Sequence, residues 1–144
     1  MKPGQIIKSS SQLDGSYFEN SRILIAEYNE KGALGFLLNR PFSRSLNELV
    51  EFRHSPPFPL FEGGPVDQEH LFIVHRRPDL IAGSRPVNDK LFIGGDMNAA
   101  VKYINNKTLQ PGDIFIFVGY CGWNKGELDA EMEEGSWFAD DGSI

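Results

Sequence analysis

The chain has almost no cysteine and no long apolar segment. Cys121 is the single cysteine among 144 residues, so no intramolecular disulfide can form, which fits a reducing compartment. The opening residues, MKPGQIIKSSS, lack the apolar core of a signal peptide. The longest apolar run covers residues 114–118 and is far too short to span a bilayer. The sequence therefore predicts a cytoplasmic protein that does not enter the membrane.

Positive charge is also scarce. The chain carries 14 Lys and Arg against 20 Asp and Glu, a net charge of −6, and its pI is near 5.0. The densest basic cluster, at residues 75–77, is only His-Arg-Arg. Nucleic-acid binding depends on Lys and Arg that face phosphates, and the sequence has no helix-turn-helix pattern or basic recognition helix. Direct binding to nucleic acid is therefore not expected.

Motifs for catalysis and for cofactors are missing as well. The three histidines, His54, His70 and His75, stand at none of the spacings that bind zinc. No G-x-S-x-G elbow and no G-x-G-x-x-G loop is present. Cys121 has apolar neighbours, which indicate an inert buried thiol rather than a nucleophile. We therefore expect no cofactor and no bound metal.

The chain consists instead of short apolar runs separated by Gly, Pro, Asn and Asp, the pattern of several strands with few helices. Strands are expected at residues 22–28, 33–39, 71–75, 91–93 and 114–118, the first two joined as a hairpin by the polar residues 29–32. Helices are expected at residues 45–52, with a capping box of Ser45 and Glu48, and at residues 97–105, behind Asp96 as the N-cap. With 40% hydrophobic residues, the chain fits one α+β domain over residues 1–144.

The most distinctive segment is residues 119–137, GYCGWNKGELDAEMEEGSW. A glycine-spaced aromatic turn is expected to lead into a helix that begins near Lys125, with Asn124 as its cap and Gly135 as its stop. The five carboxylates of this helix repel one another, by about 0.2–0.5 kcal/mol for each i, i+4 pair. A solvated helix face is the favoured interpretation, and a surface for a cation or a basic partner is the alternative.

Three aromatic side chains, Tyr120, Trp123 and Trp137, stand around this acidic helix. We interpret them as core anchors whose O–H and N–H groups find local partners, and an aromatic pocket is the alternative.

A polar pair, Asn39 and Arg40, leaves the end of an expected strand. Arg40 can offer its guanidinium to a ligand carboxylate, or pair within the chain with Glu127 or Glu131 and so neutralise the acidic helix. The candidate residues for binding a ligand or partner are therefore Asn39, Arg40, Tyr120, Trp123, Glu127 and Glu131.

Several blocks of the chain, in the same order, resemble the YqgE/AlgH family of bacterial proteins. They are residues 3–4 (PG), 35–41 (GFLLNRP), 63–66 (GGPV), 91–94 (LFIG) and 119–123 (GYCGW), with Gly126, Leu128, Glu131, Gly135 and Trp137. Cys121 departs from the family pattern, in which a small residue such as alanine is expected. The resemblance implies a single compact α+β domain with a bent, barrel-like mixed or antiparallel sheet packed by a few helices. The chain ends seven residues after Trp137, where family members continue with another strand and helix. The resemblance therefore implies either that the sequence is cut short or that these elements are absent, in which case a sheet edge is exposed.

The family label links some members to transcriptional regulation. Together with the missing catalytic motifs, the resemblance favours a non-catalytic cytoplasmic domain that binds a protein or a small ligand in a regulatory role. The alternative is an enzyme that uses carboxylates of residues 127–134 with Arg40 or a histidine, with or without a divalent cation. The sequence leaves the ligand, the partner and the oligomeric state open.

Overall fold

The structure, a computed structural model, describes residues 1–144. Nine strands form one sheet: β1 Ile6–Ser9, β2 Arg22–Asn29, β3 Gly32–Leu37, β4 Leu60–Glu62, β5 Val66–His75, β6 Arg85–Pro86, β7 Phe92–Ile93, β8 Ile114–Asn124 and β9 Trp137–Asp140. Two α-helices, α1 Met97–Asn105 and α2 Glu127–Glu133, and three 3₁₀ helices, η1 Ser11–Leu13, η2 Leu46–Glu48 and η3 Val50–Phe52, complete the fold. Neither α-helix has the length and apolar character needed to cross a membrane.

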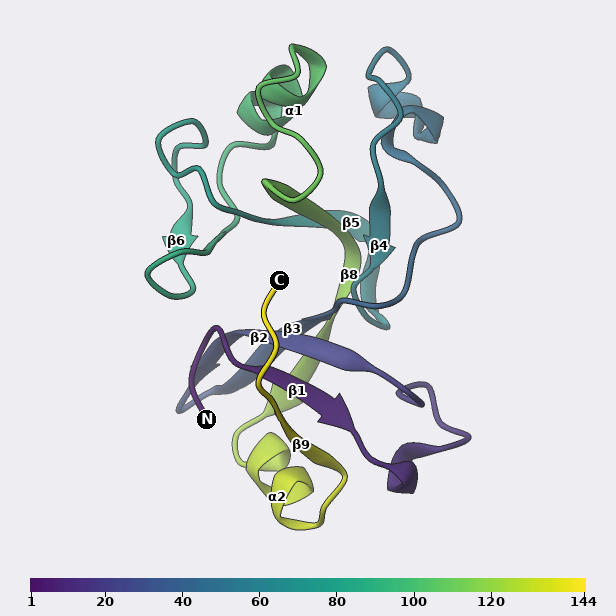
Figure 1. Cartoon of the computed structure of the whole chain (residues 1–144), viewed down its shortest axis with the longest axis vertical. Helices are drawn as coiled ribbons and strands as arrows, with labels where there is room; N and C mark the ends of the chain where they lie inside the picture. Colours follow the sequence, from purple (N-terminus) through teal and green to yellow (C-terminus); the bar gives the residue numbers. More distant parts are fainter.

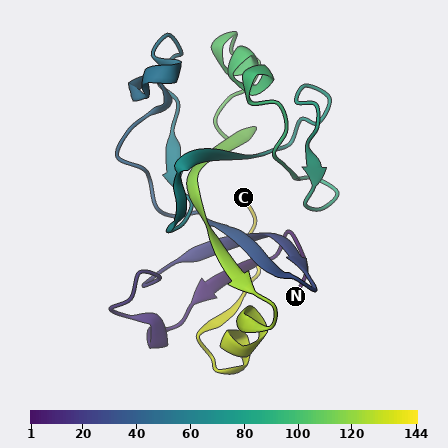
Figure 2. The same ribbon diagram turned by 180° about the vertical axis from the view of Figure 1, so that it is seen from behind.

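The sheet is curled around one long strand, β8. The strand order is β6-β7-β5-β8-β3-β2-β1-β9, and β4 pairs in parallel with β8 beside this path. Figures 1 and 2 show two halves that β8 joins: one holds β4–β7, α1 and the 3₁₀ helices η2 and η3, and the other holds β1–β3, β9 and α2. The predicted α+β domain with a bent sheet is confirmed.

Strand β8 passes from one half to the other through a kink at Gly119. Before the kink its residues 114–118 pair with β5, and after it residues 121–124 pair with β3. Gly119 has φ +75°, and a Cβ there would lie 2.6 Å from the carbonyl oxygen of Gly64. Opposite the kink, β5 has a bulge between Val66 and Leu71, where its register with β8 shifts. The expectation of a turn at residues 119–122 was therefore wrong, because the glycine bends the strand without ending it.

The core follows this division into halves. One cluster lies under α1 and includes Ile81, Ile104 and Ile116, and another lies against α2 and includes Trp123 and Trp137. A middle cluster joins the halves, and in it the rings of Phe36 and Phe117 stack with centroids 4.6 Å apart. Figure 1 shows the C-terminus returning to this middle region, where Ile144 packs on the cluster.

The helix at residues 97–105 has the predicted bounds, and the side chain of Asp96 accepts hydrogen bonds from the amides of residues 98 and 99. Residues 45–52 differ from the prediction. The capping box of Ser45 and Glu48 is present, but Leu49 has an extended backbone and divides the segment into η2 and η3. The division also turns Val50 outward, with 78% of its surface exposed, so it does not share an inward face with Leu46.

The acidic helix begins two residues later than expected. Strand β8 continues to Asn124, which pairs with Gly32, and the N-cap of α2 is Gly126 with φ +79°. The side chain of Asn124 donates to the carboxylate of Glu127 at 2.8 Å instead of capping the backbone. Gly135, with φ +84°, ends the helix as predicted. Strand β9, which pairs with β1, was not predicted.

His75, the last residue of β5, is fully buried, and both ring nitrogens contact backbone groups. Nε2 lies 3.2 Å from the carbonyl oxygen of Gly94, and Nδ1 accepts from the amide of Arg77 at 3.1 Å. Because Nδ1 is an acceptor, the ring is neutral and carries its proton on Nε2. Burial lowers the pKa of His75, although the Gly94 carbonyl and Asp79 oppose the shift.

The free energy of unfolding is therefore expected to fall as the pH drops below about 6.5, because the unfolded chain then binds a proton that folded His75 does not. Substitution of this residue by glutamine (His75→Gln) removes the titration, so the variant should lose less stability than the parent between about pH 7.5 and about pH 5.5. Urea unfolding at both pH values checks the prediction. Since both proteins share His54 and His70, an equal loss in the two would show that His75 does not cause the pH dependence.

Candidate functional site

Arg40 lies just after β3, and its guanidinium holds three segments together. Nη1 is 3.3 Å from Oε2 of Glu62 on β4, and Nη2 donates to the carbonyl oxygen of Tyr17 at 2.8 Å and to Oγ of Ser21 at 3.2 Å. The guanidinium carbon lies 4.6 Å from the centre of the Tyr17 ring. The expected internal partner, Glu127 or Glu131, was therefore wrong. The short bridge between Pro41 and Phe61 places Glu62 beside Arg40, and the sequence gives no local sign of this contact.

The neighbours of Arg40 are engaged in the same internal network. The hydroxyl of Tyr17 donates to the carboxylate of Glu62, and burial together with this bond raises the pKa of Tyr17. The Asn39 side chain accepts from the amide of Arg22 at 3.1 Å and donates to the carbonyl oxygen of Asn20 at 2.9 Å. Both predicted binding residues in this region, Asn39 and Arg40, thus hold the chain together.

Cys121 lies in the same part of the sheet. It is 1% exposed, its Sγ is 3.4 Å from the carbonyl oxygen of Gly63, and burial raises the pKa of the thiol to about 12. A thiol with so high a pKa carries almost no thiolate at neutral pH. The predicted burial of this cysteine is confirmed.

Two of the other predicted residues, Trp123 and Glu131, meet at α2. Oε1 of Glu131 accepts from Nε1 of Trp123 at 3.2 Å and from Nε1 of Trp137 at 2.9 Å. Both indoles are buried, and their rings meet edge to face at 6.2 Å. The interpretation of the tryptophans as core anchors with local partners is confirmed, and Glu131 belongs to this core rather than to the solvated face. Tyr120 packs edge to face on Phe72 at 5.3 Å, away from the indole pair.

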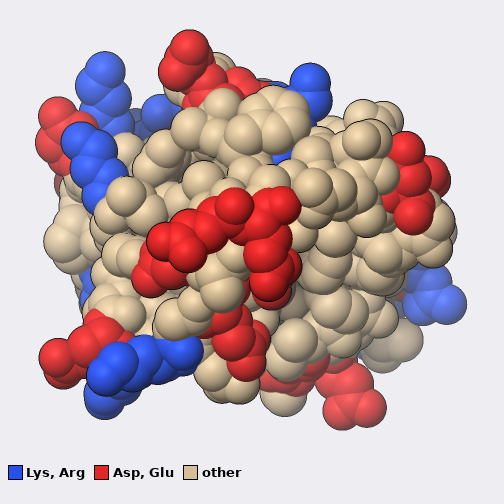
Figure 3. All heavy atoms as spheres, turned by 90° about the horizontal axis from the view of Figure 1, so that it is seen from below, with Lys and Arg blue, Asp and Glu red and all other residues tan.

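The remaining carboxylates of the α2 segment are exposed. Figure 3 shows acidic side chains gathered across the face at this end of the molecule. Those that belong to this segment are Glu127, Asp129, Glu133 and Glu134. Asp129 accepts a hydrogen bond from the hydroxyl of Tyr28 at 2.5 Å. No group of three or more His, Cys, Asp or Glu side chains in the chain is arranged to hold a metal ion.

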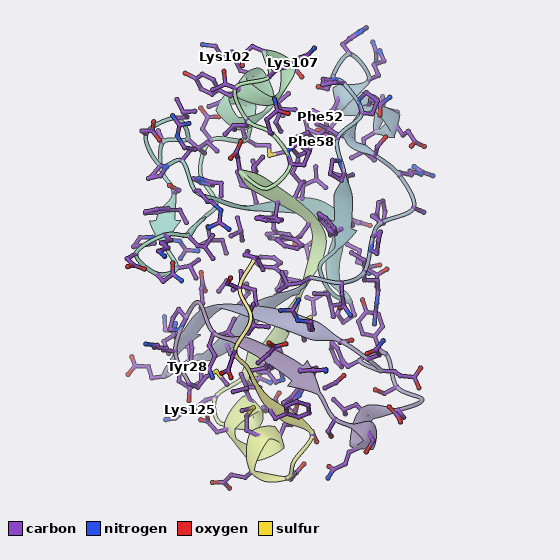
Figure 4. The ribbon with its side chains drawn as sticks, viewed as in Figure 1. Tyr28, Phe52, Phe58, Lys102, Lys107 and Lys125 are labelled. Carbon is purple, nitrogen blue, oxygen red and sulfur yellow. The ribbon has the colours of Figure 1, made fainter.

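A groove lies in the other half of the molecule and contains none of the predicted residues. This groove has a volume of about 490 Å³, and its walls come from η3, from the bulged part of β5 and from the start of α1. Its apolar lining is Phe42, Leu49, Val50, Phe52, Leu71, Met97 and Val118. Figure 4 shows Phe52, one of these residues, in the region between α1 and the 3₁₀ helices. The segments that line the groove are far apart in the sequence, so no local pattern describes the groove as a whole. The apolar residues within 45–52 are the one sequence signal that could have pointed to it.

Five polar residues complete the groove lining: Arg44, Glu51, Gln68, Glu69 and His70. Nδ1 of His70 is 2.6 Å from Oδ1 of Asp67, and this hydrogen bond and the carboxylate charge raise the pKa of His70. Asp67 itself has φ +53°, a conformation that non-glycine residues rarely adopt. The groove therefore presents an open apolar surface with charged groups at its margin, an arrangement suited to binding.

Comparison with known proteins places the chain among bacterial relatives. The model of the AlgH-like family, DUF179, matches residues 6–143. A protein of Chlorobium limicola is 37% identical over 141 residues, which are 98% of this chain and 75% of the relative. A protein of Parabacteroides distasonis is 36% identical over 136 residues, 93% of this chain and 69% of the relative. Both are called UPF0301 protein, a name that states no activity.

Two solved structures share the fold. The solution structure of AlgH from Pseudomonas aeruginosa has a TM-score of 0.77 at 22% identity and covers 98% of this chain and 77% of that protein. The crystal structure of protein DIP2367 from Corynebacterium diphtheriae has a TM-score of 0.76 at 21% identity and covers 96% of this chain and 75% of that protein. At these identities the likeness concerns the fold alone.

Proposed function

Because this chain belongs to the AlgH-like family, DUF179, whose relatives carry names that state no activity, we propose a function from its geometry. The protein is a non-catalytic, cytoplasmic binding domain with a regulatory role, and it takes a protein partner or a small ligand in the groove beside η3. Transcription is the process that the family label suggests for this role.

The observation that carries the proposal is the exposed apolar lining of the groove. Val50 is 78% exposed, and Phe42, Leu49, Phe52, Leu71 and Met97 are only partly covered. Burial of apolar surface is worth roughly 25 cal/mol for each Å², so a partner that covers these side chains gains affinity. Ligand sites are typically hollows of about 300–1,000 Å³, and the groove falls within this range.

A neutral apolar probe tests the groove directly. We expect indole or phenol, titrated into the protein, to shift the backbone NMR signals of residues 42–52, 68–71 and 97. Substitution of Val50 by asparagine (Val50→Asn) should weaken this binding several-fold, since it removes part of the apolar lining. The matched control is Phe138→Asn, because Phe138 on β9 is also exposed, at 47%, but does not line the groove. Shifts centred on α2, or an equal effect of both substitutions, would exclude the groove as the binding site.

The alternative is an enzyme that combines carboxylates of residues 127–134 with Arg40 or a histidine. In the structure these side chains do not come together. Arg40 pairs with Glu62, and Glu131 accepts from two indoles. His75 contacts Gly94 and Arg77, and His70 contacts Asp67. The binding function therefore has the better support.

A further inference from the structure

We propose that the groove binds a basic amphipathic segment of a partner protein. Apolar side chains of the segment fill the hollow, and its Lys or Arg side chains pair with Glu51 and Glu69 at the margin. This inference rests on the proposed function of the groove and names the class of partner that it takes.

The charges around the groove are unequally compensated. His70 is paired with Asp67 at 2.6 Å. Arg44 lies near Glu48, whose pKa is lowered mainly by hydrogen bonds from Ser45 and in smaller part by Arg44. His70 therefore has an acidic partner within the chain, whereas Arg44 contributes to lowering the pKa of Glu48 without forming an ion pair with it.

Glu51 and Glu69 form no ion pair, although the charge of Glu69 makes a minor contribution to the raised pKa of His70. Both line the groove, and neither forms an ion pair within 4.0 Å, the distance that defines the chain's five pairs. Among the charged lining residues that form no ion pair, Glu51 and Glu69 outnumber Arg44, so the charge left uncompensated around the groove is negative. The net charge of −6 on the whole chain acts in the same direction and favours the approach of a cation.

The shape of the apolar lining favours a peptide segment over a small cation. The apolar side chains come from separate segments, residues 42, 49, 50, 52, 71, 97 and 118, and together they form an open surface rather than a closed pocket. Grooves of this kind accept an amphipathic helix through side chains spaced i, i+3, i+4 and i+7. Met97 adds a flexible contact that can adapt to such side chains.

The two α-helices of a second copy do not fit the groove as such a segment. The exposed face of α2 is acidic, and the helix has no basic residue in its last turn. Helix α1 carries Lys102, but its apolar residues Ala100 and Ile104 are buried in the core of their own molecule. Neither α-helix of a second copy therefore offers a free basic amphipathic face, which favours a different protein as the partner.

The test uses three synthetic helix-forming peptides with leucine at i, i+3, i+4 and i+7 and with only Lys, only Glu or only Gln at the polar positions. Fluorescence anisotropy with the 144-residue protein measures their affinities. We expect the Lys peptide to bind about tenfold more tightly than the Gln peptide and the Glu peptide to bind most weakly, with the difference reduced at high salt. Val50→Asn should weaken binding of both the Lys and the Gln peptide.

Two double variants separate the local charge from the overall charge. Glu51→Gln with Glu69→Gln should lower the affinity for the Lys peptide by roughly fivefold, because two exposed ion pairs are lost. Glu133→Gln with Glu134→Gln removes the same charge from the α2 end and should leave the affinity within about twofold. An equal loss in both double variants would overturn the proposal.

The remaining outcomes are also decisive. If the three peptides bind equally and Val50→Asn weakens all of them, the groove is a binding site but the basic partner is wrong. If indole binds in the groove and no peptide does, the site serves a small ligand and the proposal fails. If neither indole nor any peptide binds there, the proposed function fails with it.

Discussion

The free energy of unfolding is expected to fall by about 2–4 kcal/mol when Gly119 is replaced by alanine (Gly119→Ala). Two effects add at this position. Gly119 has φ +75°, which costs an L-residue about 1–2 kcal/mol. The new Cβ would also lie 2.6 Å from the carbonyl oxygen of Gly64 and 2.8 Å from that of Val66, and both contacts are with backbone that cannot move without opening the sheet.

Gly122 offers a matched control in the same strand. Its φ is not positive, and the nearest atoms to a new Cβ belong to the Tyr120 ring, at 3.5 Å. Gly122→Ala should therefore change the free energy of unfolding by no more than about 0.5 kcal/mol. Urea unfolding of the parent and both variants measures the difference. Equal effects at the two glycines would mean that β8 does not pass through a strained kink at Gly119.

The second large fall in the free energy of unfolding is expected when the Glu131 carboxylate is removed. Glu131→Ala leaves the indole N–H groups of Trp123 and Trp137 without an acceptor inside the core. A buried polar group without a partner costs about 1–3 kcal/mol, so we expect a loss of about 2–5 kcal/mol. Thermal or urea unfolding, followed through tryptophan fluorescence, reports both the stability and the surroundings of the two indoles.

Two further variants identify the cause of that loss. Glu131→Gln keeps an acceptor oxygen at the same position and should recover most of the stability. Glu133→Ala removes an exposed carboxylate from the same helix and should cost at most about 0.5 kcal/mol. If Glu131→Gln were as unstable as Glu131→Ala, the negative charge rather than the hydrogen bonds would hold the tryptophans.

Local signals in the sequence were reliable where one segment decides its own structure. The β2–β3 hairpin follows from two apolar runs around a polar turn, and α1 follows from the Asp96 cap and its apolar spacing. Strand β8 was predicted only to Val118, because Gly119 and Gly122 hide the alternation of buried and exposed residues that continues to Asn124. The first half of β5 was missed because residues 66–70 are exposed and mostly polar.

The candidate site was less accessible to sequence reasoning, since it depends on contacts between distant segments. The glycine–aromatic segment attracted attention because its composition is unusual, yet Glu131 and the two tryptophans there stabilise the core. Pairing within the chain was one of the two interpretations of Arg40, with Glu127 or Glu131 as the partner, but the actual partner, Glu62, is placed by the pairing of Pro41 with Phe61. The groove joins residues from four parts of the chain, and no single window of sequence contains it.

The proposal that binding takes place at the groove, and not at the acidic helix, is tested most directly by hydrogen exchange with and without the Lys peptide. Protection should increase in residues 46–52 and 66–71 and stay unchanged in residues 126–136. Protection confined to residues 126–136 would contradict the account, because it would place the partner on α2.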